Sequence, residues 1–186
     1  MATEYEFKYI LALEFLNEFN EETLMDMCSE WAHIKQGYIV ANETTDLRIR
    51  YMQPYTSTSF WTMTFKYNTG SRVIEVERRL EDRDGQDLWD ICTRRVSKVR
   101  YFFPSAKYTW ELDVLKRDEE TYFILAEVEL PEGSPRPQAP PFFEKYVLYE
   151  VDLTDTRFSN KKLGDVEYAT DLYRQIKQGG NDGHES

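Results

Sequence analysis

The sequence is poor in the residues that build metal–thiolate sites, disulfide frameworks and covalent active sites. It contains two cysteines, Cys28 and Cys92, far apart in the chain, and two histidines, His33 and His184. No CxxC motif or Cys/His cluster occurs, so neither a zinc site nor a disulfide framework is indicated. Without a histidine dyad or a nucleophilic cysteine arrangement, covalent catalysis is disfavoured as well. We interpret both cysteines as buried, reduced structural residues.

The chain also lacks an apolar run long enough to span a bilayer, and its first residues do not form a basic, apolar signal region. We therefore expect a soluble, cytoplasmic protein with no membrane partner. The net charge is −11 and the isoelectric point about 4.8, which argues against a general nucleic-acid-binding surface. A net figure does not exclude an internal cluster of lysines and arginines, however. The oligomeric state cannot be read from the sequence.

Length and composition indicate one globular domain, expected over residues 1–178, followed by a disordered polar tail over residues 179–186. The 186 residues are enough to bury a core. A content of 41% hydrophobic and 15% aromatic residues is typical of globular proteins. Prolines crowd residues 131–141, which predicts an irregular surface loop because proline cannot donate to a β-ladder.

Periodicity predicts a strand-dominated α+β protein. Apolar residues recur at helical spacing over residues 21–31, with Asn20 as N-cap, and over 84–96 and 166–178. Alternation of period two marks seven or eight strands, around residues 5–9, 47–51, 61–65, 74–76, 99–101, 110–114, 126–130 and 146–148. So many amphipathic strands in a short chain suggest a closed or nearly closed antiparallel barrel.

Charged residues fill the alternate positions of the same strands, and most of the sets carry one sign only. The ordinary interpretation places such residues on solvent-exposed outer faces, with the apolar residues forming the core inside. Segregation by sign weakens this interpretation, because like charges two residues apart gain nothing on a solvent face. The sets are Glu4, Glu6 and Lys8; Arg48 and Arg50; Lys66 with Thr62 and Thr64; Glu75 and Glu77; Lys98 and Arg100; Glu111 and Asp113; and Glu127 and Glu129.

The alternative interpretation is an inverted barrel, in which charged residues line a wet internal cavity and apolar residues face outward under the helices. Buried charges are tolerated only if they pair or bind ions and ligands. Arginine and lysine would then hold phosphate oxygens, and the carboxylates would hold hard divalent cations. Both groups in one cavity suit metal-assisted phosphoryl transfer by direct hydrolysis.

A series of short motifs follows in order from residue 4 to about residue 163. They are ExExK at 4–8, IxQGY at 34–38, RxR at 48–50, TxK at 64–66, ExE at 75–77, KVRY at 98–101, WELD at 110–113, AEVE at 126–129 and TDTRFSNK at 154–161. In this order they resemble the signatures of the CYTH superfamily, also called triphosphate tunnel metalloenzymes. ExExK alone is a weak signal, but the ordered series is a strong one. The stretch from 11 to 33 and the proline-rich loop are longer than in compact members.

The resemblance implies an eight-stranded antiparallel closed β-barrel, or tunnel, with a charged lumen and a few helices covering it outside. It also implies a Mg²⁺ or Mn²⁺ cofactor and a small-molecule triphosphate as the partner. The implied catalytic residues are Glu4, Glu6, Lys8, Lys66 and Lys98. The implied phosphate-binding residues are Lys8, Arg48, Arg50, Lys66, Lys98, Arg100, Arg157 and Lys161. The implied metal ligands are Glu4, Glu6, Glu75, Glu77, Asp113, Glu127 and Glu129.

Three functional hypotheses are compatible with these residues. The first is a metal-dependent hydrolase that removes the terminal phosphate of inorganic tripolyphosphate or of a small organic triphosphate. The second is an adenylate cyclase of the same superfamily, which would need an adenine pocket that no residue identifies. The third is a non-catalytic module that binds a triphosphate or polyphosphate. The repeated charges indicate triphosphate recognition, but they do not indicate the organic part of a substrate.

Overall fold

The computed structural model describes residues 4–70, 72–105 and 107–179, and for Glu4 the backbone only. It confirms the strand-dominated α+β class. Within these residues, nine antiparallel strands form one sheet in the order β5-β4-β3-β2-β6-β7-β8-β1-β9. The strands are β1 (Glu4–Leu11), β2 (Glu30–Ala41), β3 (Thr45–Pro54), β4 (Phe60–Asn68), β5 (Val73–Leu80), β6 (Arg94–Pro104), β7 (Thr109–Arg117), β8 (Glu120–Pro131) and β9 (Val147–Val151).

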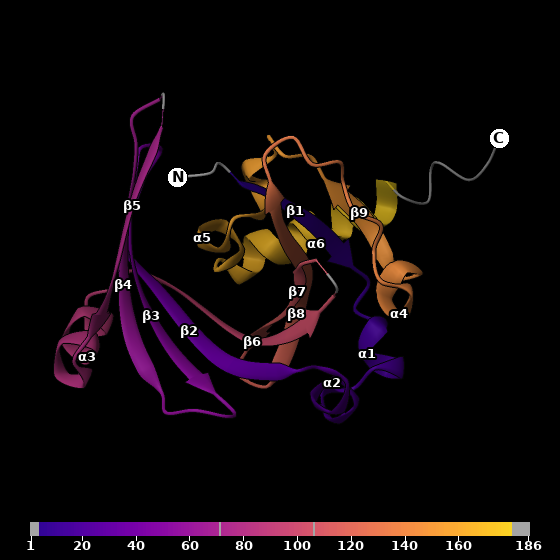
Figure 1. The fold of residues 1–186 in the computed structure, drawn as a ribbon, viewed down its shortest axis with the longest axis horizontal. Coiled ribbons are helices and arrows are strands. Elements are labelled where there is room, and N and C mark those ends of the chain that lie inside the picture. The colour runs from indigo at the N-terminus through magenta and orange to yellow at the C-terminus, as the bar shows by residue number, and fades with distance from the viewer. Residues whose placement is uncertain (1–3, 71, 106, 180–186) are drawn as a thin grey trace.

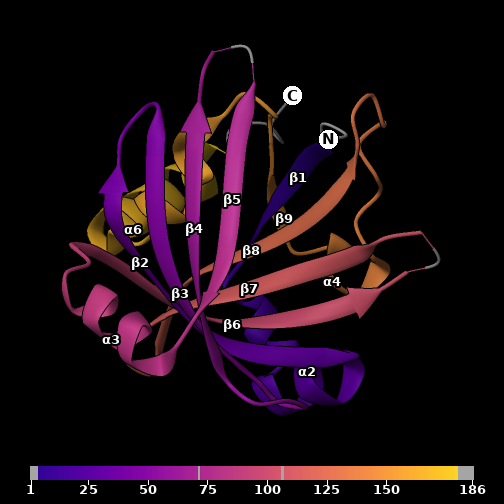
Figure 2. The ribbon, with the colours of Figure 1, turned by 60° about the vertical axis from the view of Figure 1, so that its left-hand side comes forward.

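The sheet is strongly curved but is not closed by hydrogen bonds within the described residues. Its edge strands are β5 and β9, which pair only with β4 and β1 respectively. The expected closed barrel of eight strands is therefore not confirmed. Figure 1 shows β2 to β5 forming one wall and β1 with β9 lying opposite, and Figure 2 shows β2 to β5 side by side in that wall. The strand that the alternation did not mark is β2.

The helices are short except for the last one. They are α1 (Phe15–Glu18), α2 (Glu21–Met27), α3 (Asp82–Asp90), α4 (Pro141–Glu144), the 3₁₀ turn η1 (Thr156–Phe158), α5 (Asn160–Leu163) and α6 (Val166–Gly179). The predicted cap of α2 is confirmed, because Asn20 Oδ1 accepts a hydrogen bond of 2.9 Å from the amide of Thr23. Within the described residues, no helix has the length and apolar composition needed to cross a membrane.

Two of the expected helices end earlier than predicted. Residues 21–31 were expected to form one helix, but α2 stops at Met27, Cys28 is extended, and Glu30 already begins β2. Residues 84–96 were expected to form another, but α3 stops at Asp90 and β6 begins at Arg94. In both places the chain joins the sheet, whose pairing overrides the helical spacing of a few apolar residues. Of the expected tail, Gly179 ends α6, and residues 180–186 lie outside the described residues.

The main apolar core lies on the convex side of the sheet. Alternate residues of β1, such as Phe7 and Tyr9, are buried there together with Trp110 of β7. Helices α1, α2 and α4 cover this side with side chains that include Phe15, Leu24 and Phe143, all fully buried. A smaller core under α3 contains Ile49, Trp61 and Cys92. Helices therefore cover the apolar faces from outside, as the inverted arrangement requires.

Helix α6 lies on the concave side, where no helix was expected. At one end of this face, the inward-pointing strand positions are apolar instead of charged. Two residues after Lys8 on β1 comes Ile10, and two residues before Glu127 on β8 comes Leu125. Leu163 of α5 and Leu172 of α6 pack against these residues. Figure 1 shows α5 and α6 between the wall of β2 to β5 and strands β1 and β9. The helices thus fill one end of the concave face and leave the charged part next to them.

Candidate functional site

The charged positions of the strands gather on the concave face, so the interpretation that spreads them over a solvated exterior is wrong. On β1, Phe7 and Tyr9 are buried in the convex core, while Lys8 between them points to the concave face and donates to Glu127 on the adjacent strand β8. The strand registers bring the charged sets together, because Lys8 stands opposite Glu127 and Arg100 stands opposite Asp113. Successive side chains of a strand point to opposite faces, so the alternation in the sequence produces this segregation.

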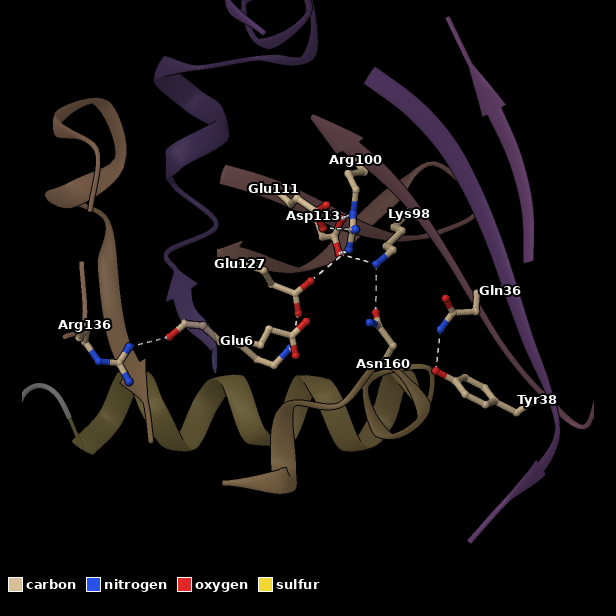
Figure 3. A network of polar contacts seen from close by, with 11 residues as sticks. Glu6, Gln36, Tyr38, Lys98, Arg100, Glu111, Asp113, Glu127, Arg136 and Asn160 are labelled. Atoms are coloured by element: carbon tan, nitrogen blue, oxygen red, sulfur yellow. Dashed lines mark hydrogen bonds and ion pairs between the residues drawn. The ribbon is translucent and has the colours of Figure 1, made fainter. Parts of the chain in front are cut away.

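Arg100 lies at the centre of the acidic part of the site, between three carboxylates (Figure 3). Its Nε donates to Asp113 Oδ1 at 2.6 Å, and its Nη2 donates to Asp113 Oδ2 at 2.7 Å and to Glu127 Oε2 at 3.1 Å. Nη1 forms a further ion pair with Glu111. The guanidinium fork thus holds Asp113 in two parallel bonds, the geometry that makes arginine–carboxylate pairs specific.

Two lysines complete this chain of alternating charges. Lys98 donates to Asp113, and it also donates to Asn160 Oδ1 of α5 at 3.2 Å. Lys8 donates to Glu127 and forms an ion pair of 2.6 Å with Glu6. Lys98, Asp113 and Glu127 are almost completely buried, which is tolerable because each has an opposite charge and a hydrogen bond. The buried charges of Lys98, Asp113 and Glu127 therefore belong to one connected network of ion pairs.

The network shifts the pKa values of its members. Burial alone would raise the pKa of Asp113, but the charges of Arg100 and Lys98 hold it well below its usual range. Burial, aided by the charge of Arg100, lowers the pKa of Lys98 to about 8. Burial also raises the pKa of Glu111, against the opposing charge of Arg100. The pKa of Lys8 is raised, because Glu127 and Glu6 outweigh the effect of its burial.

The opposite wall of the concave face carries a second set of charges from β2 to β5. Gln36 is fully buried; it accepts a hydrogen bond of 3.0 Å from Arg50 Nε and donates one of 2.6 Å to Tyr38 Oη. Burial and the neighbouring charge of Arg48 lower the pKa of Arg50 to about 10. Arg48 Nε is buried and has no hydrogen-bond partner among the described residues. An unsatisfied buried donor is costly, so this atom marks a place for an acceptor.

Strand β5 adds its two glutamates to this wall. Lys66 Nζ lies 3.0 Å from Glu75, and Thr64 Oγ1 donates to Glu77 at 2.8 Å. Arg48 Nη2 lies 3.9 Å from Glu75 and 4.0 Å from Glu77. These pairs are looser and more exposed than those around Arg100, and such contacts contribute little free energy. They are consequently easier to exchange for a ligand.

Two cavities open on the concave face and share Glu6. The larger has a volume of about 790 Å³, within the range typical of small-molecule sites. Its wall is rich in cations drawn from distant parts of the sheet and includes Lys8, Arg48, Lys66, Arg94, Lys161 and Lys162. The smaller, of about 280 Å³, is rich in carboxylates and includes Glu6, Glu111, Glu127 and Glu129 beside Lys107 and Tyr108. A basic compartment therefore adjoins an acidic one.

Seven of the fifteen predicted residues line these cavities: Glu6, Lys8, Arg48, Lys66, Glu127, Glu129 and Lys161. Arg50, Glu75 and Glu77 lie on the wall of β2 to β5 without lining either cavity. Lys98, Arg100 and Asp113 line neither cavity; they lie behind the walls in the buried network. Lys161 lines the larger cavity, where its Nζ is 3.0 Å from Asp46 Oδ1. Arg157 is half-exposed and paired with its near neighbour Asp155. The side chain of the predicted ligand Glu4 lies outside the described residues.

Sequence reasoning assigned no role to four residues of the site. Glu111 was recognised in the charged set with Asp113 but was not among the candidate site residues. Gln36 and Tyr38 lie in the IxQGY segment, but single polar residues of a central strand give no signal of their own. Asn160 reaches Lys98 from α5, a contact that only the tertiary structure creates.

Divalent metal binding fits the chemistry of the acidic compartment but not its present arrangement. Carboxylate oxygens are the ligands that Mg²⁺ and Mn²⁺ prefer. Within the described residues, however, no three acidic, histidine or cysteine side chains are gathered closely enough to hold an ion. Glu127 is occupied by Lys8 and Arg100. An ion would therefore have to take the place of these cationic partners.

Comparisons with known proteins agree with this architecture. No protein-family profile matches the sequence, and no curated protein matches it either. Among solved structures, the hypothetical protein NE1496 matches with a TM-score of 0.54 and 27% identity, over 87% of this chain and 97% of that chain. A second match is HpAC1 from Hippeastrum, described as an adenylyl cyclase candidate with a dominant triphosphatase activity. It has a TM-score of 0.53 and 16% identity, over 70% of this chain and 80% of that chain. The chain therefore shares the fold of these two structures, which is consistent with the resemblance that the sequence motifs predict.

Proposed function

We propose that the chain binds a triphosphate in the larger cavity and hydrolyses its terminal phosphoanhydride bond with the help of Mg²⁺ or Mn²⁺. The observation that carries this proposal is the convergence of cations from β1, β3, β4 and α5 on one cavity, as Lys8, Arg48, Lys66 and Lys161. Their spacing around a cavity suits an extended polyanion better than a single phosphate. The triphosphatase activity described for HpAC1, which shares the fold, points the same way.

The cavity cations would grip the phosphate oxygens. Arg48 Nε is buried without a partner in the described structure and would donate to an oxygen of the bound chain. Lys66 is paired with Glu75, and Lys161 is paired with Asp46. Both carboxylates are partly exposed, so each lysine would exchange its carboxylate for a phosphate oxygen. Charge-assisted bonds to phosphate are among the strong hydrogen bonds in proteins. From behind the wall, Arg50 would add positive charge that stabilises the transferring phosphoryl group.

Glu6, Glu127 and Glu129 would hold the divalent ion at the border between the two cavities, with Glu111 beside them. When bound, such an ion neutralises phosphate charge and acidifies water. Glu6 would orient the attacking water and accept its proton on a carboxylate oxygen; its position on the wall of both cavities supports this role. The water oxygen would bond to the terminal phosphorus as the bond to the bridging oxygen breaks. The products are then phosphate and diphosphate.

Phosphate release from tripolyphosphate tests this proposal. With Mg²⁺ or Mn²⁺ we expect turnover by the unaltered chain and none in excess chelator. Lys66→Ala should lower kcat/KM by about 100-fold or more, because it removes a donor to the transferring group. Lys35→Ala is the matched control, since Lys35 is exposed on β2 and lines neither of the two cavities. Full activity in chelator, or equal activity of the two variants, would refute the proposal.

A further inference from the structure

The proline-rich loop between β8 and α4 sends one charged side chain, Arg136, back onto the sheet. Arg136 Nη2 donates to the carbonyl of Val151 on β9, and Nη1 donates to the carbonyl of Lys8 on β1 at 3.4 Å. Figure 3 shows Arg136 beside these strands, on the far side of β1 from the ion network. One side chain of the loop therefore bonds both strands at the same level.

Arg136 is itself held firmly in this place. Its guanidinium carbon lies 5.0 Å from the ring centre of Phe7 and 5.2 Å from that of Tyr9, distances at which cation–π attraction operates. Its Nε is 3.6 Å from Glu150. Tyr9 Oη in turn donates to the carbonyl of Pro137, the next residue of the loop. The contact is thus reciprocal, since the loop holds the strand and the strand holds the loop.

Arg136 binds at the end of the β1–β9 ladder. Lys8 and Val151 are the outermost partners of β1 and β9; from there towards Glu6, β1 pairs only with β8. A strand end without a neighbour on one side frays more easily. This end carries Glu6 and Lys8, both of which line the larger cavity. Phe7 and Tyr9 point to Arg136, and alternation directs Lys8, which lies between them, into the site.

We propose that Arg136 is a positioning residue: it clamps the end of the β1–β9 ladder and thereby sets where the ammonium group of Lys8 stands in the cavity. It touches neither cavity itself, so it acts through Lys8. This inference gives the proline-rich loop a part in ligand binding, and it rests on the proposed triphosphate site.

The chain offers a closely matched control in Arg95. Arg95 also combines a cation–π contact, 4.8 Å from the Trp89 ring, with hydrogen bonds to two backbone carbonyls, those of Trp89 and Asp90. Arg95 belongs to β6, which β7 and β8 separate from β1, and its side chain binds the C-terminal end of α3. Arg136→Ala and Arg95→Ala therefore remove the same kinds of contact, but only the first touches the strand that carries Lys8.

The first test measures tripolyphosphate affinity by calorimetry in chelator, so that turnover cannot interfere. Arg136→Ala should weaken binding by about tenfold, or about 1.4 kcal/mol, whereas Arg95→Ala should leave it unchanged. Arg136→Lys, which keeps the charge but loses the fork, should lie between. In a Lys8→Met background the effect of Arg136→Ala should disappear, because a positioning residue has nothing left to position. Equal affinities of the two alanine variants, or additive effects in the cycle, would overturn the inference.

The second test does not depend on the ligand. Hydrogen exchange should be faster, by about tenfold or more, at the amides of residues 6–8 and 150–151 in Arg136→Ala, and unchanged in the core of β7. If the unaltered chain did not bind tripolyphosphate, the proposed function would fail, and this exchange pattern would still decide whether Arg136 clamps the ladder. Exchange in β1 equal to that of Arg95→Ala would show that it does not.

Discussion

At the scale of single residues, the site depends on charges that are buried and shared. Asp113 accepts from both Lys98 and Arg100, so two cations share this carboxylate. Removing one partner of a buried pair typically costs about 3–5 kcal/mol, because it leaves an uncompensated charge. Such residues stabilise the arrangement of the site as well as its chemistry. A residue behind the cavity wall can therefore matter as much as one that lines it.

The titration of Lys98 gives a prediction for stability against pH. Its pKa in the folded chain is lowered by burial to about 8, from an ordinary value of 10.5. Between these two pH values the unfolded chain binds the proton more tightly than the folded chain, so folding stability contributed by this group rises with pH. The unfolding free energy of the natural chain, relative to Lys98→Met, should therefore increase from pH 8 towards pH 10. Urea unfolding of both proteins across this range measures the difference.

A difference that stays flat or falls over this range would contradict the lowered pKa of Lys98. Lys35→Met serves as the control, because this exposed lysine should show no such rise relative to the natural chain. The comparison within each pair removes the contributions of titrating groups that do not interact with the substituted lysine.

Individual site residues could be predicted from the sequence where their strand partners repeat the pattern. Lys8, Arg48 and Lys66 all belong to alternating charged sets, and all line the larger cavity. What could not be predicted is which members of a set meet solvent and which are buried behind it. Lys98 and Lys66 look alike in the sequence, yet Lys98 is almost fully buried and Lys66 is half-exposed. That difference arises from α5 and α6, which cover one end of the concave face.

At the scale of elements, alternation predicted the strands with one apolar face well, whereas β2 was indicated only by the IxQGY motif at residues 34–38. Its buried face carries Ala32, Ile34, Gln36 and Tyr38, while His33 and Lys35 on the other face are exposed; the polar Gln36 interrupts the apolar series, so the alternation of hydrophobic residues is not clean. Its first residues also continue the apolar spacing of α2, which extended the predicted helix. The apolar stripe of α6 was predicted correctly from its helical spacing, but such a stripe does not indicate which side of the sheet the helix will cover. The two sides differ only once the sheet has curved.

Helix α3 supplies a prediction about close packing between an element and the sheet. Gly85 is buried in α3, and a Cβ at this position would lie 2.2 Å from Cγ of Trp61 on β4. Alanine is favoured over glycine inside a helix by about 1 kcal/mol, but overpacking a rigid indole costs about 1–3 kcal/mol. Because the approach of 2.2 Å is far inside contact distance, the cost should fall in the upper part of this range. We therefore expect Gly85→Ala to lower the unfolding free energy by roughly 1–2 kcal/mol, measured by urea denaturation.

Gln86→Ala is the control for this helix, because Gln86 is exposed and its side chain bonds only the exposed Asp90 at 3.0 Å. It should change stability little. If Gly85→Ala were as stable as the natural chain, helix and sheet would have room to separate, and the close approach of α3 to Trp61 would not be a constraint.

At the scale of the whole molecule, the charge distribution opposes the ligand that the site is proposed to bind. The chain carries a net charge of −11, while the larger cavity gathers lysines and arginines from both walls of the curved sheet. At low ionic strength, about 0.01 M, charges act over roughly 30 Å, but at 0.15 M over only about 8 Å. An approaching polyanion therefore meets the repulsion of the whole surface first and the attraction of the cavity last.

This opposition predicts an unusual response of triphosphate binding to salt. In chelator, the association rate constant of tripolyphosphate should rise as ionic strength increases from about 0.01 M to 0.15 M, because salt screens the long-range repulsion more than the close contacts. The dissociation rate should rise further, since salt also weakens the ion pairs with Lys66 and Arg48, so affinity falls overall. Stopped-flow mixing at several salt concentrations measures both rates. An association rate that falls with salt would mean that the cavity's own field reaches beyond the surface and steers the ligand inward.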